Sequence, residues 1–168
     1  PEHLNFVFLD FKGGSAFRKL ERLPHTVGSV CDLDLAHAVR ALRALEAELT
    51  RREQLSAAVH ASDIRDMVNP PPRLIVVIDE FHALKDQLPD YVNRLVRIAS
   101  LGRSLGMYLL ACTPNPMGQV SADMKANMSV SICFIRSSFI PKYTPSQLFS
   151  KILRNFVPLA SLCNRAQR

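Results

Sequence analysis

Two adjacent carboxylates end the most apolar stretch of the sequence. Asp79 and Glu80 follow five consecutive branched apolar residues, 74–78. In open parallel sheets, ligands bind beyond the carboxyl ends of the strands, and alternation along a strand turns neighbouring side chains in different directions. One acid could therefore hold a Mg²⁺ ion or its water while the other polarises an attacking water. This is the Walker-B arrangement of enzymes that hydrolyse nucleoside triphosphates.

A structural role is the alternative for the same pair. Acids directly before "EFHAL" also favour the start of a helix, because the helix dipole stabilises negative charge at that end. His82, which follows the pair, and His25 in "LPHT" are interpreted as packed or capping residues. The stretch by itself leaves both roles of the acids open.

A glycine pair follows the first apolar segment, in "LDFKGGSAF". Gly13 and Gly14 permit backbone conformations that other residues avoid, which fits a functional strand-to-helix connection or a plain tight turn equally well. The stretch is not a phosphate-binding loop of the G-x-x-x-x-G-K-[ST] type, because Lys12 precedes the glycines.

Arg103 is a further candidate, in "ASLGRSLGMYLLACTPNP". A cation near the end of a helix is stabilised by the dipole, which would be a structural role. The alternative is an arginine that contacts a phosphate bound to a neighbouring subunit.

Apolar segments alternate with helical patterns along the chain. Short runs rich in Val, Ile, Leu and Phe predict buried strands over 4–10, 74–79, 107–112 and 130–135. Leucines at helical spacing predict a helix over 35–55 with Asp34 as its N-cap, and a second helix is predicted over 90–106, ending at Gly106. This order predicts an α/β fold, a mainly parallel sheet with helices on both faces. The outer face of the first helix is expected to be solvated; it carries Arg40, Arg43, Glu46, Glu48, Arg51 and Arg52.

The composition is that of a globular domain. The chain has 168 residues, 48% of them hydrophobic, and a net charge of +6, which is compatible with an anionic partner.

The four cysteines form no Cys-x-x-Cys pair, so a reducing compartment is favoured over a disulfide scaffold or zinc site. Cys112 and Cys133 are predicted to be small core residues. No apolar run approaches the ~20 residues that span a bilayer. Because the chain opens almost directly into a strand and without Met, we expect a piece of a longer protein.

An ordered set of motifs resembles the FtsK/SpoIIIE family of P-loop ATPases. The segments are "DFKGGSAF", "LPHTVGSVCDLD", "AELTRREQL", "LIVVIDEF", "GRSLGMYLLA" and "SADMKANMSVSICF". Within the family, "DFKGG", "LPH" and "GRSLG" are similar to the EssC/EccC branch of type VII secretion, whereas DNA-translocating members more often read "DPKG" and "KARAAG". The resemblance runs from about Leu4 to Phe134, so residues 1–134 are interpreted as the C-terminal part of one ATPase domain. Residues 135–168 are interpreted as a divergent tail or the end of the same domain.

The resemblance implies a three-layer, RecA-like fold of the ASCE class, incomplete here at its N-terminus, with ATP and Mg²⁺ as cofactors. Asp79 matches the Walker-B aspartate that binds the metal and the nucleotide, and Glu80 matches the catalytic glutamate. Arg103 matches the arginine that reaches into the adjoining ATP site. Asn127, in "KAN", matches a recurrent asparagine whose role is taken as structural.

The sequence departs from the family pattern in three places. The Walker-A loop belongs upstream of "DFKGG" and is absent, so this chain alone should bind ATP feebly or not at all. The family's "ATQ.P" is here "ACTPNP", which puts Thr113 in the place of a nucleotide-sensing Gln. From about Ile135 onward the polar and acidic residues of the family are missing.

These features favour a fragment of an ATP-dependent motor for protein export, in a protein anchored at the cytoplasmic face of the bacterial cell membrane. The implied partners are neighbouring ATPase modules or subunits and secreted protein substrates. Two alternatives stay open: a DNA-translocating ATPase of chromosome or plasmid transfer, and a degenerate module that binds nucleotide or partner without turnover. Thr113 favours degeneration, and the intact pair of Asp79 and Glu80 argues against it.

Overall fold

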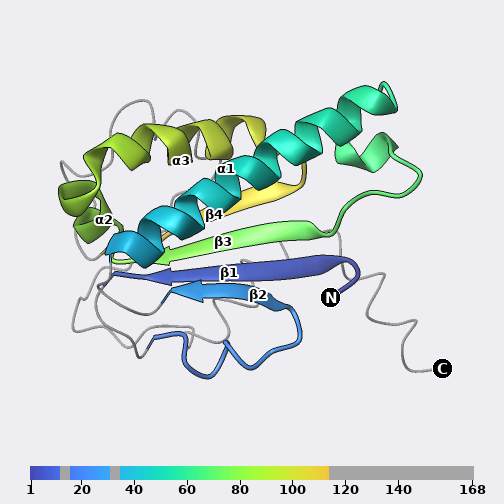
Figure 1. Ribbon diagram of the computed structural model, residues 1–168. Helices are drawn as coiled ribbons and strands as arrows, with labels where there is room; N and C mark the ends of the chain where they lie inside the picture. The colour runs from blue at the N-terminus through green and yellow to red at the C-terminus, as the bar shows by residue number, and fades with distance from the viewer. Residues whose placement is uncertain (12–15, 31–34, 114–168) are drawn as a thin grey trace, which may run out of the picture. The chain divides into compact units, whose positions relative to one another are not determined.

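The computed structural model of the chain describes residues 1–11, 16–30 and 35–113. The chain divides into two compact units, Pro1–Val130 and Ser131–Arg168, and the described residues all lie in the first. They form a twisted parallel sheet and a layer of helices packed against it (Figure 1).

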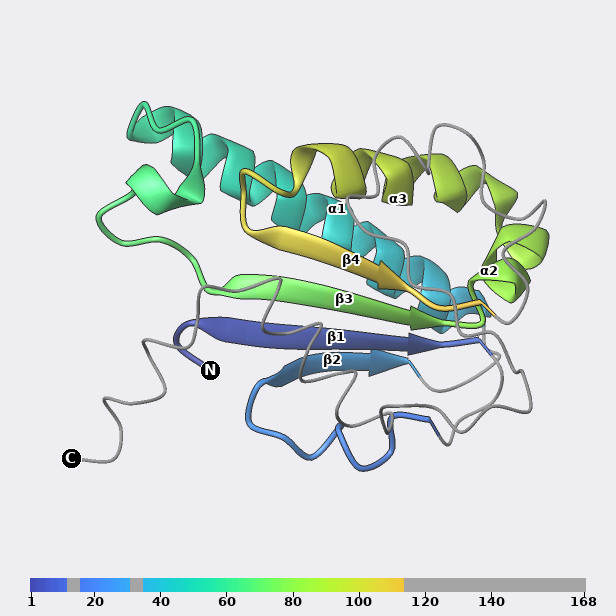
Figure 2. The same cartoon turned by 180° about the vertical axis from the view of Figure 1, so that it is seen from behind.

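Within the described residues the sheet has four parallel strands, in the spatial order β2-β1-β3-β4. Strand β1 pairs with β3 along its whole length, from Leu4 opposite Arg73 to Asp10 opposite Asp79. Figure 2 shows the four arrowheads pointing the same way, so all the strands end at one edge of the sheet. The strands are β1 (Leu4–Asp10), β2 (Thr26–Val30), β3 (Arg73–Asp79) and β4 (Met107–Ala111).

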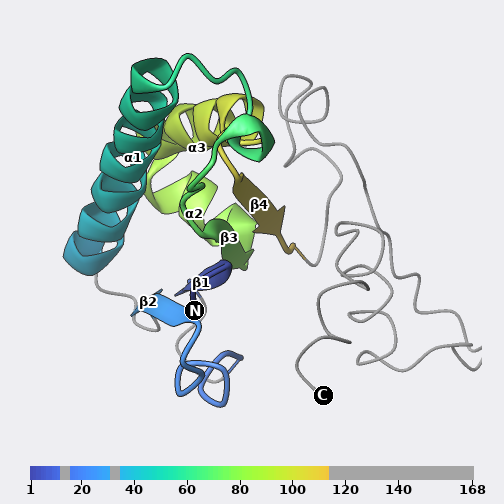
Figure 3. The same cartoon turned by 90° about the vertical axis from the view of Figure 1, so that its right-hand side faces the viewer.

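In the part of the chain that the structure describes, three helices cover one face of this sheet (Figure 3). They are α1 (Leu35–Ala58), α2 (Phe81–Gln87) and α3 (Pro89–Leu101), and a short 3₁₀ helix, η1 (Ile64–Asp66), follows α1. Alternation along the strands sends Leu9, Val76 and Ile78 into the helical layer, and each is fully buried. Each such buried aliphatic side chain contributes about 1.5–3 kcal/mol, so this layer stabilises the sheet.

The strand predictions are largely confirmed. The segment over 4–10 is β1, the one over 74–79 is β3 with Arg73 added, and the one over 107–112 is β4 without its last residue. The predicted strand over 130–135 lies outside the described residues. Strand β2 was not predicted, because it is short, alternates between half-buried and exposed residues and has no apolar run.

The helix predictions are confirmed in position and corrected at their ends. The first helix extends to Ala58, and the predicted cap Asp34 lies outside the described residues. The second helix ends at Leu101 instead of Gly106, because Gly102 closes it and residues 102–106 form a turn in which Gly106 has a φ of 71°. Only glycine adopts that left-handed conformation without steric cost. In the described part of the chain the helices lie on one face, where both faces were expected to carry them.

Candidate active site

Asp79 and Asp10 lie side by side at the carboxyl edge of the sheet. They are the last residues of β3 and β1 and are paired in register. Register partners on parallel strands point to the same face, and this face is the one away from the helices, since Ile78 and Leu9 point into the helical core. Asp10 is only 2% exposed. Two carboxylates are thereby placed where ligands bind in parallel sheets.

Glu80 follows directly and has an unusual backbone. Its φ of 53° and ψ of 50° are left-handed, which costs a non-glycine residue about 1–2 kcal/mol. The side chain is 9% exposed, and its Oε2 lies 2.9 Å from Nδ1 of His82. Although Glu80 is the N-cap residue of α2, its side chain makes no capping hydrogen bond. Backbone strain of this kind concentrates at functional sites, which favours a chemical role for Glu80 over a capping one.

The chain leaves β4 next to these acids. The backbone N–H of Cys112 donates to the carbonyl of Ile78 (2.8 Å), and the Cys112 carbonyl accepts from Phe81 N–H (2.9 Å). These bonds connect the exit of β4 to the end of β3 and the start of α2. Thr113 is half-buried, and because it directly follows Cys112 its backbone lies at the same edge of the sheet as Asp79.

Cys112 itself is exposed, and the prediction that it is a core residue is wrong. The strand ends at Ala111, one residue before it, so Cys112 lies beyond the part of the sheet that the helices cover. Partial desolvation of the thiol, and to a lesser extent the Asp79 carboxylate, raise the pKa of Cys112 above its ordinary value. The effect of Asp79 places negative charge near the thiol.

Arg103 lies at the opposite edge of the sheet. It is exposed in the turn that precedes β4, and strands of seven residues separate that edge from Asp79 and Glu80. At about 3.3 Å per residue the separation is about 20 Å. The structure therefore brings Asp79, Glu80 and Thr113 together and keeps Arg103 away from them. Lys12, Gly13, Gly14 and Asn127 lie outside the described residues.

The donor set at the carboxyl edge fits a magnesium nucleotide in part. Carboxylate oxygens are preferred ligands of Mg²⁺, which commonly binds one or two of them together with phosphate oxygens and water. Asp79 offers such an oxygen at the end of a rigid, buried strand. In the described part of the chain no cluster of three or more metal-binding side chains is found, so the remaining ligands would have to come from elsewhere.

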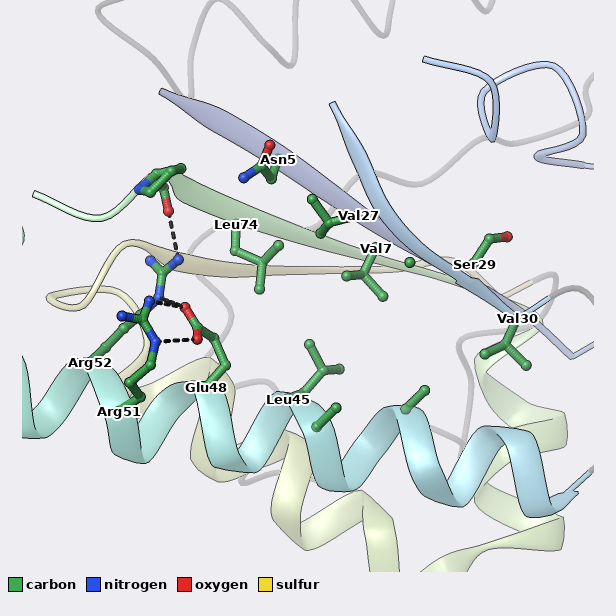
Figure 4. A pocket seen from close by; sticks show the side chains of 14 residues that line it. Asn5, Val7, Val27, Ser29, Val30, Leu45, Glu48, Arg51, Arg52 and Leu74 are labelled. Carbon is green, nitrogen blue, oxygen red and sulfur yellow. Dashed lines mark hydrogen bonds and ion pairs between the residues drawn. The ribbon is translucent and has the colours of Figure 1, made fainter. Parts of the chain in front are cut away.

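A groove of about 460 Å³ lies on the other side of the sheet, between the β2 edge and α1 (Figure 4). Val7, Val27 and Leu45 line its apolar part, and Glu48 with Arg51 stands at one end. It is on the helix-covered face and does not include Asp79 or Glu80. The candidate site for nucleotide chemistry is therefore separate from this groove.

The sequence did not identify the positions of two further residues, Asp10 at the carboxyl edge and Arg52 on α1. Asp10 was read only as the end of a strand, although it ends β1 as Asp79 ends β3. Arg52 was expected on the solvated face of α1 but is 4% exposed, so that expectation is wrong. Arg52 lies three residues after buried Leu49 and four before buried Ser56, and residues at that spacing share one face of a helix. This spacing could have predicted that Arg52 faces the core.

Comparison with known proteins agrees with the motifs. The model of the FtsK/SpoIIIE family matches residues 1–69. The type VII secretion system protein EssC of Staphylococcus aureus (strain NCTC 8325 / PS 47) is 34% identical over 136 residues, which are 76% of this chain and 9% of that protein. The chain thus spans a small part of the curated relatives it matches.

Solved structures show the same relationship. The cytoplasmic domain of the Thermomonospora curvata type VII secretion ATPase EccC has a TM-score of 0.67 and 34% identity, covering 76% of this chain and 16% of that one. EssC (ATPases 2 and 3) from Geobacillus thermodenitrificans has a TM-score of 0.68 and 26% identity, covering 76% and 25%. The fold described above is that of part of such an ATPase domain. No helix in the described ranges is both long and apolar enough to cross a membrane.

Proposed function

This chain is homologous to the FtsK/SpoIIIE-family ATPases EssC and EccC, and on that premise we propose that it supplies the Walker-B half of an ATP-hydrolysing motor module. The observation that carries the proposal is the placement of Asp79 and Glu80 at the carboxyl end of a buried parallel strand, level with the exit of β4. The sequence contains no phosphate-binding loop of the G-x-x-x-x-G-K-[ST] type.

Asp79 would bind the cation of the nucleotide, and Glu80 would accept a hydrogen bond from the attacking water and draw off its proton. When bound, the magnesium nucleotide supplies the reactive phosphorus and a cation that neutralises developing charge. Burial of Glu80 and the rigidity of β3 hold the carboxylate in place without reorganisation. Thr113, two residues after the end of β4, would respond to the state of the nucleotide through its hydroxyl group.

Arg103 would serve a neighbouring module. It is exposed at the edge opposite Glu80, so it cannot contact a nucleotide at its own Asp79. In a head-to-tail assembly, the amino edge of one module faces the carboxyl edge of the next. An arginine placed there would stabilise the charge of the transferred phosphoryl group in the neighbour.

The biological role that we propose is protein export by a type VII secretion system. The names of the relatives, EssC and EccC, support secretion. Secreted proteins would be the substrates, neighbouring ATPase modules the partners, and the cytoplasmic side of the membrane the location. DNA translocation is the alternative, because the fold is shared between motor types and does not choose between them. Stimulation of ATP hydrolysis by DNA and not by secreted protein would favour that alternative.

The experiment measures Mg²⁺-dependent ATP hydrolysis by the full-length motor protein that carries this chain. Glu80→Gln is expected to lower kcat by about 10²–10⁴-fold, the range for loss of a general base. Glu53→Gln, on the half-exposed side of α1, is the matched control and should leave turnover unchanged. If the unsubstituted protein binds ATP but shows no Glu80-dependent turnover, the chain belongs to a degenerate module, and the proposal is wrong.

A further inference from the structure

Arg52 is a buried cation for which the proposed chemistry has no use. Its side chain is 4% exposed on a helix whose neighbouring arginine, Arg51, is 51% exposed. Burying a guanidinium is costly unless nearly all of its N–H groups find acceptors. The acceptors that Arg52 uses therefore show what its burial achieves.

Arg52 binds two chain segments that approach the sheet from its amino edge. Nη1 donates to the carbonyls of Leu105 (2.9 Å) and Gly106 (3.3 Å), and Nη2 donates to the carbonyl of Pro72 (2.6 Å). Nε donates to Glu48 at 2.7 Å, which holds the plane of the guanidinium (Figure 4). One side chain thus connects α1 to the turn before β4 and to the connector before β3.

The turn that Arg52 binds is the one that carries Arg103. Residues 102–106 are held by further contacts: Ile64 N–H donates to Ser104 O at 2.7 Å, and Leu74 N–H donates to Gly106 O at 2.8 Å. Gly102, Leu105 and Gly106 are buried, whereas Arg103 is exposed. The turn is fixed at its carbonyls and presents one cationic side chain outward.

We propose that Arg52 is a positioning residue for Arg103, holding the turn so that Arg103 faces the ATP site of the neighbouring module. This inference rests on the proposed function, which gives Arg103 its role between modules. An arginine suits the task because its planar fork reaches three carbonyls on two segments at once, which the single ammonium of lysine does not. Arg51 is half-exposed and donates both of its described hydrogen bonds to Glu48, whereas Arg52 also donates to the turn. The two arginines therefore differ in the feature that the proposal concerns.

The test compares Arg52→Lys with Arg51→Lys in the assembled, full-length motor protein. Arg52→Lys is expected to lower kcat by about 10–100-fold, the scale of a misplaced catalytic group, with KM for ATP unchanged. Arg51→Lys should leave both constants as they are. The decisive measurement repeats Arg52→Lys in an Arg103→Ala background, where no further loss of kcat is expected.

Each outcome has a defined meaning. If Arg52→Lys costs the same factor with and without Arg103, Arg52 is a stability residue only and the positioning role is overturned, while Glu80-dependent turnover still supports the proposed function. If Arg103→Ala leaves assembled turnover unchanged, both the role of Arg103 between modules and that of Arg52 are overturned.

If Arg52→Lys fails to fold, Glu48→Gln replaces it, since this change removes the anion at Nε and leaves the carbonyl contacts. A smaller loss that again vanishes in the Arg103→Ala background supports positioning, and a persistent loss overturns it.

Discussion

Oε2 of Glu80 lies 2.9 Å from Nδ1 of His82, and Glu80 holds this position with a left-handed backbone. The imidazole is 33% exposed, whereas the Glu80 side chain is 9% exposed. His82 was interpreted from the sequence as a packed or capping residue. Its contact with Glu80 makes it a neighbour of the candidate catalytic acid. The conformation of Glu80 can be tested directly.

Glu80→Gly is expected to be more stable than Glu80→Ala by about 1 kcal/mol, because glycine accepts a φ of 53° without the steric cost that alanine retains. Both variants lose the carboxylate and the contact with His82, so their difference reports the backbone alone. The free energy of unfolding from urea titrations measures it. Equal stabilities, or a more stable alanine variant, would show that the left-handed conformation is not retained in solution.

The sequence predicted the elements that bury continuous apolar runs, and it failed where burial depends on a partner far away in the chain. A local pattern of apolar residues predicts strands β1, β3 and β4 and helix α1. Strand β2 has no such pattern: it lies at one end of the described strand order, has Gly28 at its centre and is stabilised by pairing with β1.

The same distinction between local and distant signals applies to the functional residues. Asp79 and Glu80 were identifiable because an acid pair after a buried strand is a local signal. Asp10 and Arg52 were not, because their significance comes from a register partner 69 positions away in one case and carbonyl acceptors 53 and 54 positions away in the other. Residues of this kind become visible only when the strands and turns are placed together.

Lowering the pH should remove the stability that Glu48 contributes. Its hydrogen bond to Arg51 is the largest cause, and the charge and hydrogen bond of Arg52 add to it, so that the pKa of Glu48 lies below its ordinary value of 4.5. A depressed folded-state pKa gives stability that is present above the unfolded pKa and is lost as the pH falls through the folded one. The loss should stay within about 1 kcal/mol, since the carboxylate is partly exposed.

Urea unfolding of the chain between about pH 7 and about pH 3 measures this contribution. Glu48→Gln should show a shallower decrease than the unsubstituted protein below about pH 4.5. Asp63, whose pKa is lowered by Arg65, acts with the same sign, so both proteins are compared in an Asp63→Asn background. Parallel pH profiles for the two would mean that Glu48 contributes nothing in this range.

The thiol of Cys112 should react slowly for an exposed cysteine. Its raised pKa leaves less thiolate at about pH 8, so alkylation by iodoacetamide should be several-fold slower than that of free cysteine. Asp79→Asn should speed the reaction, because it removes a negative charge that adds to the effect of desolvation on the pKa, whereas Asp86→Asn at an exposed position of α2 should not. Mass spectrometry of the Cys112 peptide separates it from the other three cysteines. No change with Asp79→Asn would place the carboxylate away from the thiol.

Gly106→Ala should destabilise the protein by about 2 kcal/mol, because it combines a left-handed backbone with a lack of space. The residue has a φ of 71°, and an added Cβ would lie 2.6 Å from Cδ1 of Ile64 and 3.3 Å from Nη1 of Arg52. Gly28→Ala is the matched control, since a Cβ there would meet Val7 at an ordinary 3.7 Å. It should change the free energy of unfolding by less than about 0.5 kcal/mol. Because Gly106 is part of the turn that Arg52 binds, equal effects of the two substitutions would contradict the fixed geometry on which the orientation of Arg103 depends.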